Sequence, residues 1–246
     1  MRHAFFAANR ALVFAHRGGT ALAPENTLAA FANGLALGAD GLELDVHLSR
    51  DGRAVVHHDR TLERTTPLQG PIAAHDAAEL ARAGVPMLAD VLAAYRNARL
   101  IVELKVNAAA LARAVVDDVR AADAVERVCI GAFGLRGLRA VRALEPAIAT
   151  SAAREEVRWA LYRSWLRWTP GRVAYGGFQV PEFAGATRVV SPTFVACAHR
   201  AGLAVQVWTV DREDDARRLL DWGVDALITD RPDIIVPLVH ARTDAR

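Results

Sequence analysis

The chain has 246 residues, of which 52% are hydrophobic, and its 30 basic and 28 acidic residues leave a formal net charge of +2. This balance argues against a nucleic-acid-binding protein, which concentrates a basic excess, and the hydrophobic content argues against a disordered chain. Two cysteines, Cys129 and Cys197, are too few for a disulfide framework. The sequence has no apolar run of about 18 residues that would span a membrane. Its first residues also lack the pattern of a signal peptide, so we expect a cytoplasmic protein.

Short apolar segments alternate with amphipathic helical patterns along the chain. The segments with strand character are residues 12–18, 41–48, 54–59, 100–106, 127–133, 147–152, 176–181, 204–210 and 225–230. A helix is expected over 26–38, with Asn26 as its N-cap and Gly38 as the residue that ends it. Alternation of this kind is typical of a parallel sheet with helical crossovers.

The second and third strand segments are joined by a short turn rather than by a helix. Asp51-Gly52 in this turn is a strong hairpin signal, so 54–59 is expected to fold back antiparallel onto 41–48. The remaining eight segments predict an α/β fold with a closed barrel. The turn-rich stretch within roughly 50–86 is interpreted as an insertion beside the barrel. Since no linker or repeat is evident, residues 1–246 are expected to form one domain.

The hairpin also suggests which side chains meet. A two-residue loop at Asp51-Gly52 would pair Asp45 with His58. Glu43 and Asp45 share one face of their strand, while the leucines and the valine that flank them form an apolar face. We therefore expect Glu43, Asp45 and His58 to converge inside the barrel.

Functional residues of such barrels gather at the carboxyl ends of the strands. The polar and aromatic residues expected there are His16, Arg17, Glu43, Asp45, Glu103, Lys105, Trp208, Thr229 and Asp230. Three of them, Glu43, Asp45 and Glu103, offer the oxygen ligands that suit Mg²⁺ or Ca²⁺ better than zinc. The alternative is that these carboxylates face solvent or form ordinary ion pairs.

The basic residues at this end of the barrel suit an anionic ligand. Arg17, Lys105 and a metal together would make an anion site, best suited to phosphate. Lys105 is the only lysine beside 29 arginines, which favours a specific role for a compact ammonium over chance. His16 and His58 are suited to proton transfer near neutral pH.

Spaced motifs connect these residues to a known family. HRGG at 16–19, PENT at 24–27, ELDV at 43–46, VELK at 102–105 and the long segment 207–233 resemble the glycerophosphodiester phosphodiesterase family. The resemblance covers essentially the whole chain and is weakest over 153–175. It implies a distorted (β/α)₈ TIM barrel with a small insertion after the second strand. It also implies site roles: a divalent metal on Glu43, Asp45 and Glu103, catalysis by His16 and His58, phosphate contacts by Arg17 and Lys105, and Trp208 on the glycerol side.

The implied reaction is metal-dependent hydrolysis of a glycerophosphodiester to sn-glycerol 3-phosphate and an alcohol. The attacking group is then either water or the neighbouring glycerol hydroxyl. Two alternatives stay open: a lysophospholipase D-type enzyme acting on single-chain lipids, and a non-catalytic barrel that binds a phosphate ligand. The full set of histidines and carboxylates argues against the second alternative, because a binding protein needs no acid–base pair.

A stretch rich in tryptophan and arginine, residues 154–173, has two interpretations. It is a helix packed on the barrel, with arginine stems covering apolar surface, or it is a surface that contacts a lysophospholipid or a membrane. The first interpretation is favoured because such apolar stripes usually belong to a core. The sequence implies no protein partner and no nucleic acid.

Overall fold

A computed structural model describes residues 3–244. Eight parallel strands form its main sheet: β1 (Leu12–His16), β2 (Gly41–Leu48), β4 (Arg99–Leu104), β5 (Val128–Ala132), β6 (Ala149–Thr150), β7 (Gly177–Pro181), β10 (Ala204–Trp208) and β11 (Ala226–Thr229). Their order is β6-β5-β4-β2-β1-β11-β10-β7. A bridge between Ser151 and Gly177 joins the two ends of this sheet. The predicted (β/α)₈ barrel is therefore confirmed, with one narrow seam between β6 and β7.

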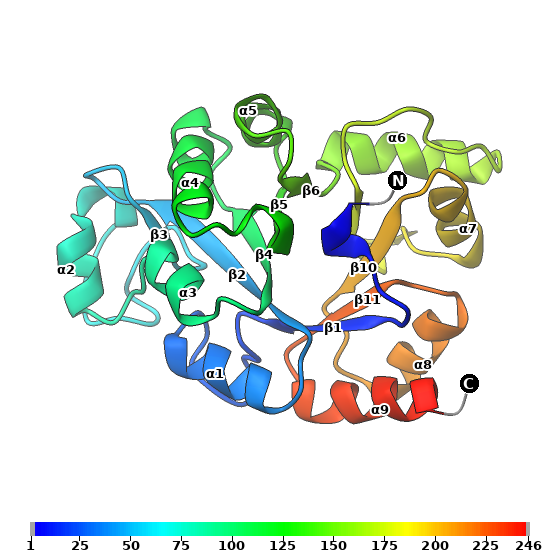
Figure 1. The fold of residues 1–246 in the computed structure, drawn as a ribbon, viewed down its shortest axis with the longest axis horizontal. Coiled ribbons are helices and arrows are strands. Elements are labelled where there is room, and N and C mark those ends of the chain that lie inside the picture. Colours follow the sequence, from blue (N-terminus) through cyan, green and yellow to red (C-terminus); the bar gives the residue numbers. More distant parts are fainter. Residues whose placement is uncertain (1–2, 245–246) are drawn as a thin grey trace.

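Helices cover the outside of the barrel (Figure 1). They are α1 (Leu28–Ala36), α3 (Leu88–Ala94), α4 (Ala109–Ala121), α5 (Leu135–Leu144), α6 (Arg154–Trp165), α7 (Pro192–Arg200), α8 (Glu213–Asp221) and α9 (Pro232–Asp244). The outward side chains of the strands, such as Leu42, Leu44 and Val46, pack against these helices in one large hydrophobic core. Over residues 3–244, no helix combines the length and the apolar character needed to cross a bilayer.

A second, smaller core lies inside the barrel. The 3-10 helix η1 (Ala4–Phe6) buries Phe5 and Phe6 against inward side chains of the strands, and the Phe5 ring stacks on Phe14 with centroids 5.9 Å apart. These aromatic rings fill the lumen near the start of β1. The polar side chains that point inward are therefore concentrated nearer the opposite end.

The predicted insertion contains β3 (Ala54–Val56), a 3-10 helix η2 (Ile72–Ala74) and α2 (Ala77–Arg82). It forms the left end of the molecule in Figure 1. A small hydrophobic cluster stabilises it, made of Val55, Leu62, Ile72, Ala77, Leu80 and Val85. This cluster holds in place the chain that follows β3, which carries His58.

The register predicted for the hairpin is wrong by one residue. Val46 pairs with Val56, so Asp45 lies opposite His57 rather than His58. The backbone N–H of His57 accordingly donates to the carbonyl of Asp45 at 3.0 Å. His58 still reaches the barrel mouth because it follows the end of β3 and is not fixed by the ladder.

The one-residue difference comes from the turn. Its loop has three residues, because the backbone N–H of Ser49 donates to the carbonyl of Arg53 at 3.0 Å. The Ser49 hydroxyl accepts from the N–H of Arg53 and donates to Asp51. Gly52 supplies the left-handed backbone, φ +79°, that a three-residue loop of this type requires.

The start of α1 also differs from the prediction. Asn26 has a left-handed backbone, φ +56°, and its side chain is used elsewhere, donating to Asp45 at 3.0 Å. Thr27 caps the helix instead, because its hydroxyl accepts from the N–H of Ala30. Gly38, with φ +92°, ends the helix as predicted.

Two features differ from the favoured predictions. A short hairpin of β8 (Phe183–Ala184) and β9 (Thr187–Arg188) follows β7. In addition, the tryptophans of α6 and of the turn after it are exposed. The interpretation of 154–173 as a helix that buries its tryptophans on the barrel is therefore wrong for these side chains.

Candidate active site

A cavity of about 600 Å³ opens at the carboxyl ends of the barrel strands. Its lining includes all eight residues to which a role was assigned: His16, Arg17, Glu43, Asp45, His58, Glu103, Lys105 and Trp208. Thr229 and Asp230, also expected at this mouth, do not line the cavity, although Asp230 contacts His16. The lining also contains residues for which no role was predicted, among them Phe133, Ser151, Arg154, Gln179 and Phe183. Residues from seven of the eight barrel strands, and from the turns that follow them, thus meet in one cavity.

The turn after β1 explains the HRGG motif. Three consecutive residues have left-handed backbones: Arg17 (φ +51°), Gly18 (φ +91°) and Gly19 (φ +97°). A Cβ on Gly18 would lie 2.7 Å from Ala30, so α1 packs directly on this turn. Left-handed non-glycine residues are costly and cluster at functional sites. In this conformation the backbone N–H of Arg17 donates to the carboxylate of Glu43 at 3.1 Å.

Three carboxylates form a compact cluster in the cavity. Glu43, Asp45 and Glu103 each offer an oxygen, and these atoms lie within 4.8 Å of one another. Burial, together with the charges of Asp45 and Glu103, raises the pKa of Glu43 to about 8. Burial also raises the pKa of Glu103, although Lys105 opposes this. A cation bound here would relieve the repulsion, so the cluster could hold a metal ion.

Two basic side chains lie against this cluster. The Lys105 ammonium is 3.2 Å from a carboxylate oxygen of Asp45 and equally far from one of Glu103. Burial opposes its charge, but these two carboxylates outweigh burial and raise the pKa of Lys105. Nε of Arg17 lies 3.1 Å from the other oxygen of Asp45. Lys105 and Arg17 therefore hold positive charge beside the carboxylates, as an anion site needs.

Each of the two candidate catalytic histidines has a carboxylate at its Nδ1 atom. Nδ1 of His16 is 2.7 Å from Asp230, and Nδ1 of His58 is 2.7 Å from Asp59. Nε2 of His16 lies 3.8 Å from Glu43. Burial opposes charge on His16, but Glu43 and Asp230 outweigh it and raise the pKa of the imidazole. A carboxylate at Nδ1 fixes the ring orientation and leaves Nε2 for proton transfer.

A network of hydrogen bonds holds the residue that pairs with His58, and it was not predicted from the sequence. Arg64 donates to Asp59 at 2.5 Å and to Glu25 at 2.6 Å, and Glu25 also contacts Arg17 at 3.3 Å. The hydrogen bond from Arg64, followed by that from His58, lowers the pKa of Asp59 to about 2. Glu25 belongs to the PENT motif, which was the sequence signal that could have identified it.

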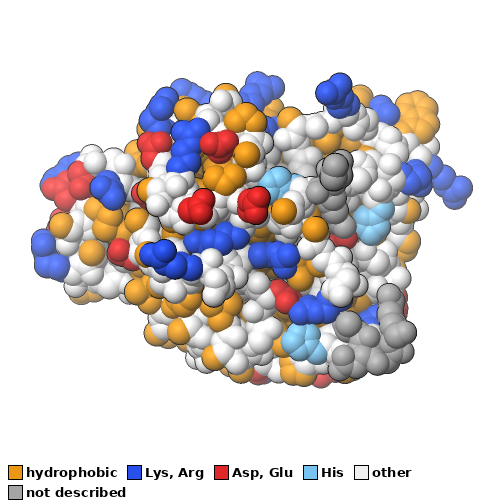
Figure 2. All heavy atoms as spheres, viewed as in Figure 1, with side chains coloured by type: hydrophobic (Ala, Val, Ile, Leu, Met, Phe, Trp, Pro, Cys, Tyr) orange, Lys and Arg blue, Asp and Glu red, His pale blue; other side chains and the backbone are white. Residues whose placement is uncertain are grey.

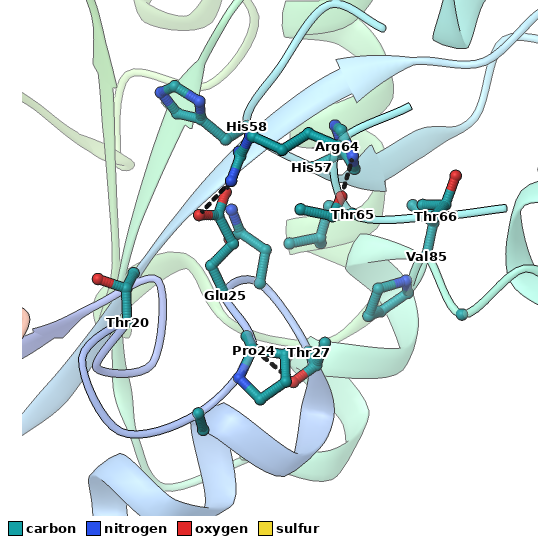
Figure 3. A pocket seen from close by; sticks show the side chains of 15 residues that line it. Thr20, Pro24, Glu25, Thr27, His57, His58, Arg64, Thr65, Thr66 and Val85 are labelled. Atoms are coloured by element: carbon teal, nitrogen blue, oxygen red, sulfur yellow. Dashed lines mark hydrogen bonds and ion pairs between the residues drawn. The ribbon is translucent and has the colours of Figure 1, made fainter. Parts of the chain in front are cut away.

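Figure 3 shows the Arg64–Glu25 ion pair in the wall of a second cavity of about 430 Å³. His58 borders this cavity as well as the first one. His57 contacts the hydroxyl of Thr65 and the backbone oxygen of Asp59, and His47 contacts the backbone oxygen of His58. His47 and His57 therefore hold the segment that carries His58.

Aromatic side chains form the apolar side of the first cavity. Trp208 packs edge-to-face on Phe133, with ring centroids 6.2 Å apart. The guanidinium of Arg154, from the start of α6, lies 5.2 Å from the centre of the Phe133 ring. This side suits the carbon chain of a small substrate, while the opposite side suits a charged group.

Taken together, the barrel brings a carboxylate cluster, two basic side chains and two carboxylate-paired histidines to one mouth. Residues 16–234 match the model of the "Glycerophosphoryl diester phosphodiesterase family". The chain belongs to this family, and it is a phosphoric diester hydrolase.

Individual relatives agree with the family assignment. The chain is 34% identical over 248 residues to "Probable glycerophosphodiester phosphodiesterase 2" of Mycobacterium tuberculosis, covering 94% of this chain and 91% of that protein. It is 30% identical over 249 residues to a glycerophosphodiester phosphodiesterase of Caldanaerobacter subterraneus, covering 94% and 98%. Among solved structures, an Oleispira antarctica phosphodiesterase in complex with the product sn-glycerol-3-phosphate has a TM-score of 0.74 at 26% identity, covering 94% of this chain and 97% of that one.

Proposed function

We propose that this enzyme hydrolyses glycerophosphodiesters to sn-glycerol 3-phosphate and an alcohol, with a divalent cation and two histidines. One observation carries the proposal: the carboxylate cluster, two basic side chains and both histidines line the same cavity. The product bound by the Oleispira antarctica relative supports the choice of glycerol phosphate.

The cation would be held by Glu43, Asp45 and Glu103. Three acidic side chains that offer oxygen ligands within 4.8 Å of one another fit Mg²⁺ or Ca²⁺. When bound, such an ion polarises the phosphoryl oxygens and neutralises negative charge on them. Arg17 and Lys105 border the cluster, and we assign them to the phosphate, where their positive charges stabilise the transition state.

The two histidines would move the protons. The oxygen of water or of the neighbouring glycerol hydroxyl attacks phosphorus, and the bond from phosphorus to the leaving alcohol breaks. One of His16 and His58 takes the proton of the attacking hydroxyl, and the other gives a proton to the leaving oxygen. If the glycerol hydroxyl attacks, water then opens the cyclic phosphate by the same proton transfers in reverse. Trp208 packs beside the glycerol in this arrangement.

The test is hydrolysis of glycerophosphocholine, followed by separate detection of glycerol 3-phosphate and choline. We expect both products in equal amounts, loss of activity in chelator, and recovery with added Mg²⁺ or Ca²⁺. Formation of phosphocholine and glycerol would mean that the other ester bond is cleaved. Binding of glycerol 3-phosphate without turnover of any diester would instead favour the phosphate-binding barrel, and preferred turnover of lysophosphatidylcholine would favour the lysophospholipase D alternative.

A further inference from the structure

Helix α6 has a buried face of small and aliphatic side chains and an opposite face rich in aromatic side chains. Ala160, Leu161 and Ser164 face the barrel and are buried. Positions that differ by three or four residues share the other face, and its large side chains are exposed. Together with the turn that follows, they form what we call the α6 aromatic face: Trp159 (57% exposed), Tyr162 (48%), Trp165 (63%), Leu166 (61%) and Trp168 (56%).

These side chains form a continuous and protruding surface. The rings of Tyr162 and Trp165 are in contact, with centroids 5.2 Å apart. The guanidinium of Arg163 lies close to two further aromatic rings, 5.7 Å from the centre of the Trp159 ring and 5.4 Å from the centre of the Trp168 ring. No other part of the described chain covers this surface. Exposed apolar patches of this kind usually mark an interaction site, so we expect a binding partner here.

The α6 aromatic face is also basic. Residues 154–172 contain five arginines and two glutamates, and one of the glutamates, Glu156, is paired with Arg142 at 2.8 Å. Arg158 and Arg167 are exposed beside the aromatic rings. Hydrophobic and basic side chains lie next to each other at the end of the molecule where α6 is found (compare Figures 1 and 2).

We propose that the α6 aromatic face binds the surface of a bilayer that contains anionic phospholipids. Tryptophan and tyrosine favour the boundary between lipid headgroups and acyl chains, and arginines are attracted to anionic headgroups. The side chains of this surface protrude from a helix and are largely exposed, so the surface suits a broad planar partner better than a single enclosed molecule.

A second copy of this chain fits the surface less well. Most dimers are symmetric and pair the same patch on both subunits. Such a pair would bring the exposed arginines of one α6 against those of the other, with few acidic groups between them. An anionic bilayer supplies the missing negative charge.

The position of α6 relates this surface to the active site. Arg154 and Val157, in its first turn, line the catalytic cavity, and the aromatic face begins with Trp159 in the next turn. The helix then runs away from the mouth, and the backbone oxygen of Arg167 accepts from Arg200 at the end of α7. A bilayer bound to this face would therefore lie along the side of the barrel, close to the cavity only at the first turns of α6. This inference does not require the proposed reaction, because binding to the bilayer needs none of the catalytic residues.

The test is binding of the full chain to vesicles, measured by co-sedimentation and by tryptophan fluorescence. Phosphatidylcholine vesicles with phosphatidylglycerol are compared with vesicles of phosphatidylcholine alone. We expect binding to the anionic vesicles that weakens with salt. Trp159→Ala/Trp165→Ala should weaken it at least about tenfold through lost apolar burial. Arg158→Gln/Arg167→Gln should weaken it about fivefold for each arginine.

Matched control variants lie on other helices. Leu28→Ala/Leu37→Ala removes exposed hydrophobic side chains from α1 and its end, and Arg113→Gln/Arg212→Gln removes exposed arginines elsewhere. Both controls should bind the vesicles like the unmodified chain. All four variants should keep their activity on glycerophosphocholine, which separates loss of bilayer binding from loss of catalysis.

Three outcomes would overturn the proposal. The first is no binding to anionic vesicles at moderate salt. The second is equal binding by the tryptophan variant and the unmodified chain. The third is a dimer in analytical ultracentrifugation that the tryptophan variant dissociates, without vesicle binding, which would make α6 a contact between copies. If the protein binds vesicles but does not cleave glycerophosphocholine, the proposed reaction fails while this inference stands.

Discussion

The Nδ1 atom of His16 lies 2.7 Å from the carboxylate of Asp230, at the far end of the chain. Asp230 is itself held, because its backbone N–H donates to Asp211 at 2.7 Å. The imidazole is thus oriented by the last strand of the barrel, and its Nε2 atom is directed to the side where Glu43 lies.

Replacing Asp230 tests this orientation. In Asp230→Asn a neutral amide faces His16, so the pKa of His16 should fall because one of the charges that raises it is lost. We expect a lower kcat and a shift to lower pH of the limb of the pH–rate profile that His16 governs. Full pH profiles of both proteins provide the measurement, and an unchanged limb would show that Asp230 does not act through His16.

Replacing His16 or His58 should reduce activity far more than replacing Asp230. His16→Ala and His58→Ala should each lower kcat on the order of 10²–10⁴-fold, the usual effect of losing a general acid or base. His75, which lies in the insertion and pairs with Glu79, is the matched control. His75→Ala should keep nearly full activity. Near-normal turnover by His58→Ala would remove that residue from the proposed mechanism.

The carboxylate cluster predicts an unusual pH dependence of stability. In the metal-free protein the pKa of Glu43 is about 8, against an ordinary value of 4.5, so between these values the folded state keeps a proton that the unfolded state has lost. The free energy of unfolding should therefore fall as pH rises from about 4.5 to about 8. Glu103 contributes with the same sign, because its pKa is also raised.

Thermal unfolding with chelator over this pH range checks the prediction. Added Mg²⁺ or Ca²⁺ should raise Tm more at the alkaline end, because the ion takes the place of the proton. Glu43→Gln should flatten the pH dependence and weaken the response to metal. A chelated protein whose Tm rises steadily from pH 5 to pH 8 would contradict the assignment of these shifts.

Lys105 should not be replaceable by arginine. Its ammonium contacts Asp45 and Glu103 at the same distance of 3.2 Å, and a longer planar guanidinium cannot occupy that position. Lys105→Arg should lower kcat/KM on the order of 10²-fold, as expected for a displacement of about 1 Å at a reacting centre. Arg113→Lys, on the exposed face of α4, is the opposite exchange and should have no effect. Wild-type kinetics in Lys105→Arg would show that Lys105 has no specific role and that the presence of a single lysine is due to chance.

The barrel could be predicted from sequence because its signals are local. Alternating apolar segments define strands, and the polar residues at their carboxyl ends must share one mouth once the strands are parallel. The acids of β2 are an example: Leu42, Leu44 and Val46 pack on the helices, so Glu43 and Asp45 have to point inward.

The hairpin register and the cap of α1 could not be predicted because side chains decide them. The Ser49 hydroxyl turns a two-residue loop into a three-residue loop. The side-chain amide of Asn26 donates a hydrogen bond to Asp45, which is distant in sequence, so Thr27 becomes the cap of α1. The ion pair of Glu25 and Arg64 likewise joins residues whose contact depends on how the insertion folds back.

The exposure of the α6 tryptophans was only the less favoured of two interpretations, for a different reason. A helix with apolar residues at helical spacing usually buries them. Here the inner face uses Ala160, Leu161 and Ser164, which are small or of medium size, so the barrel is already covered without the aromatic rings. Which of two apolar faces is buried is set by the space left on the barrel, and the sequence of the helix does not contain that information.

The single bridge between the ends of β6 and β7 makes this seam the place where we expect the barrel to open locally. Across this seam the backbone is joined by the N–H of Gly176 to the carbonyl of Thr150 and by the N–H of Ala152 to the carbonyl of Gly177, whereas β10 and β7 pair over five residues. Local opening takes the path with the fewest interactions. In hydrogen–deuterium exchange, these two amides should therefore lose protection before those of the neighbouring strands. Ser151 and Ala152 line the large cavity at this seam, so the same opening would widen its entrance and should ease the passage of a bulky molecule.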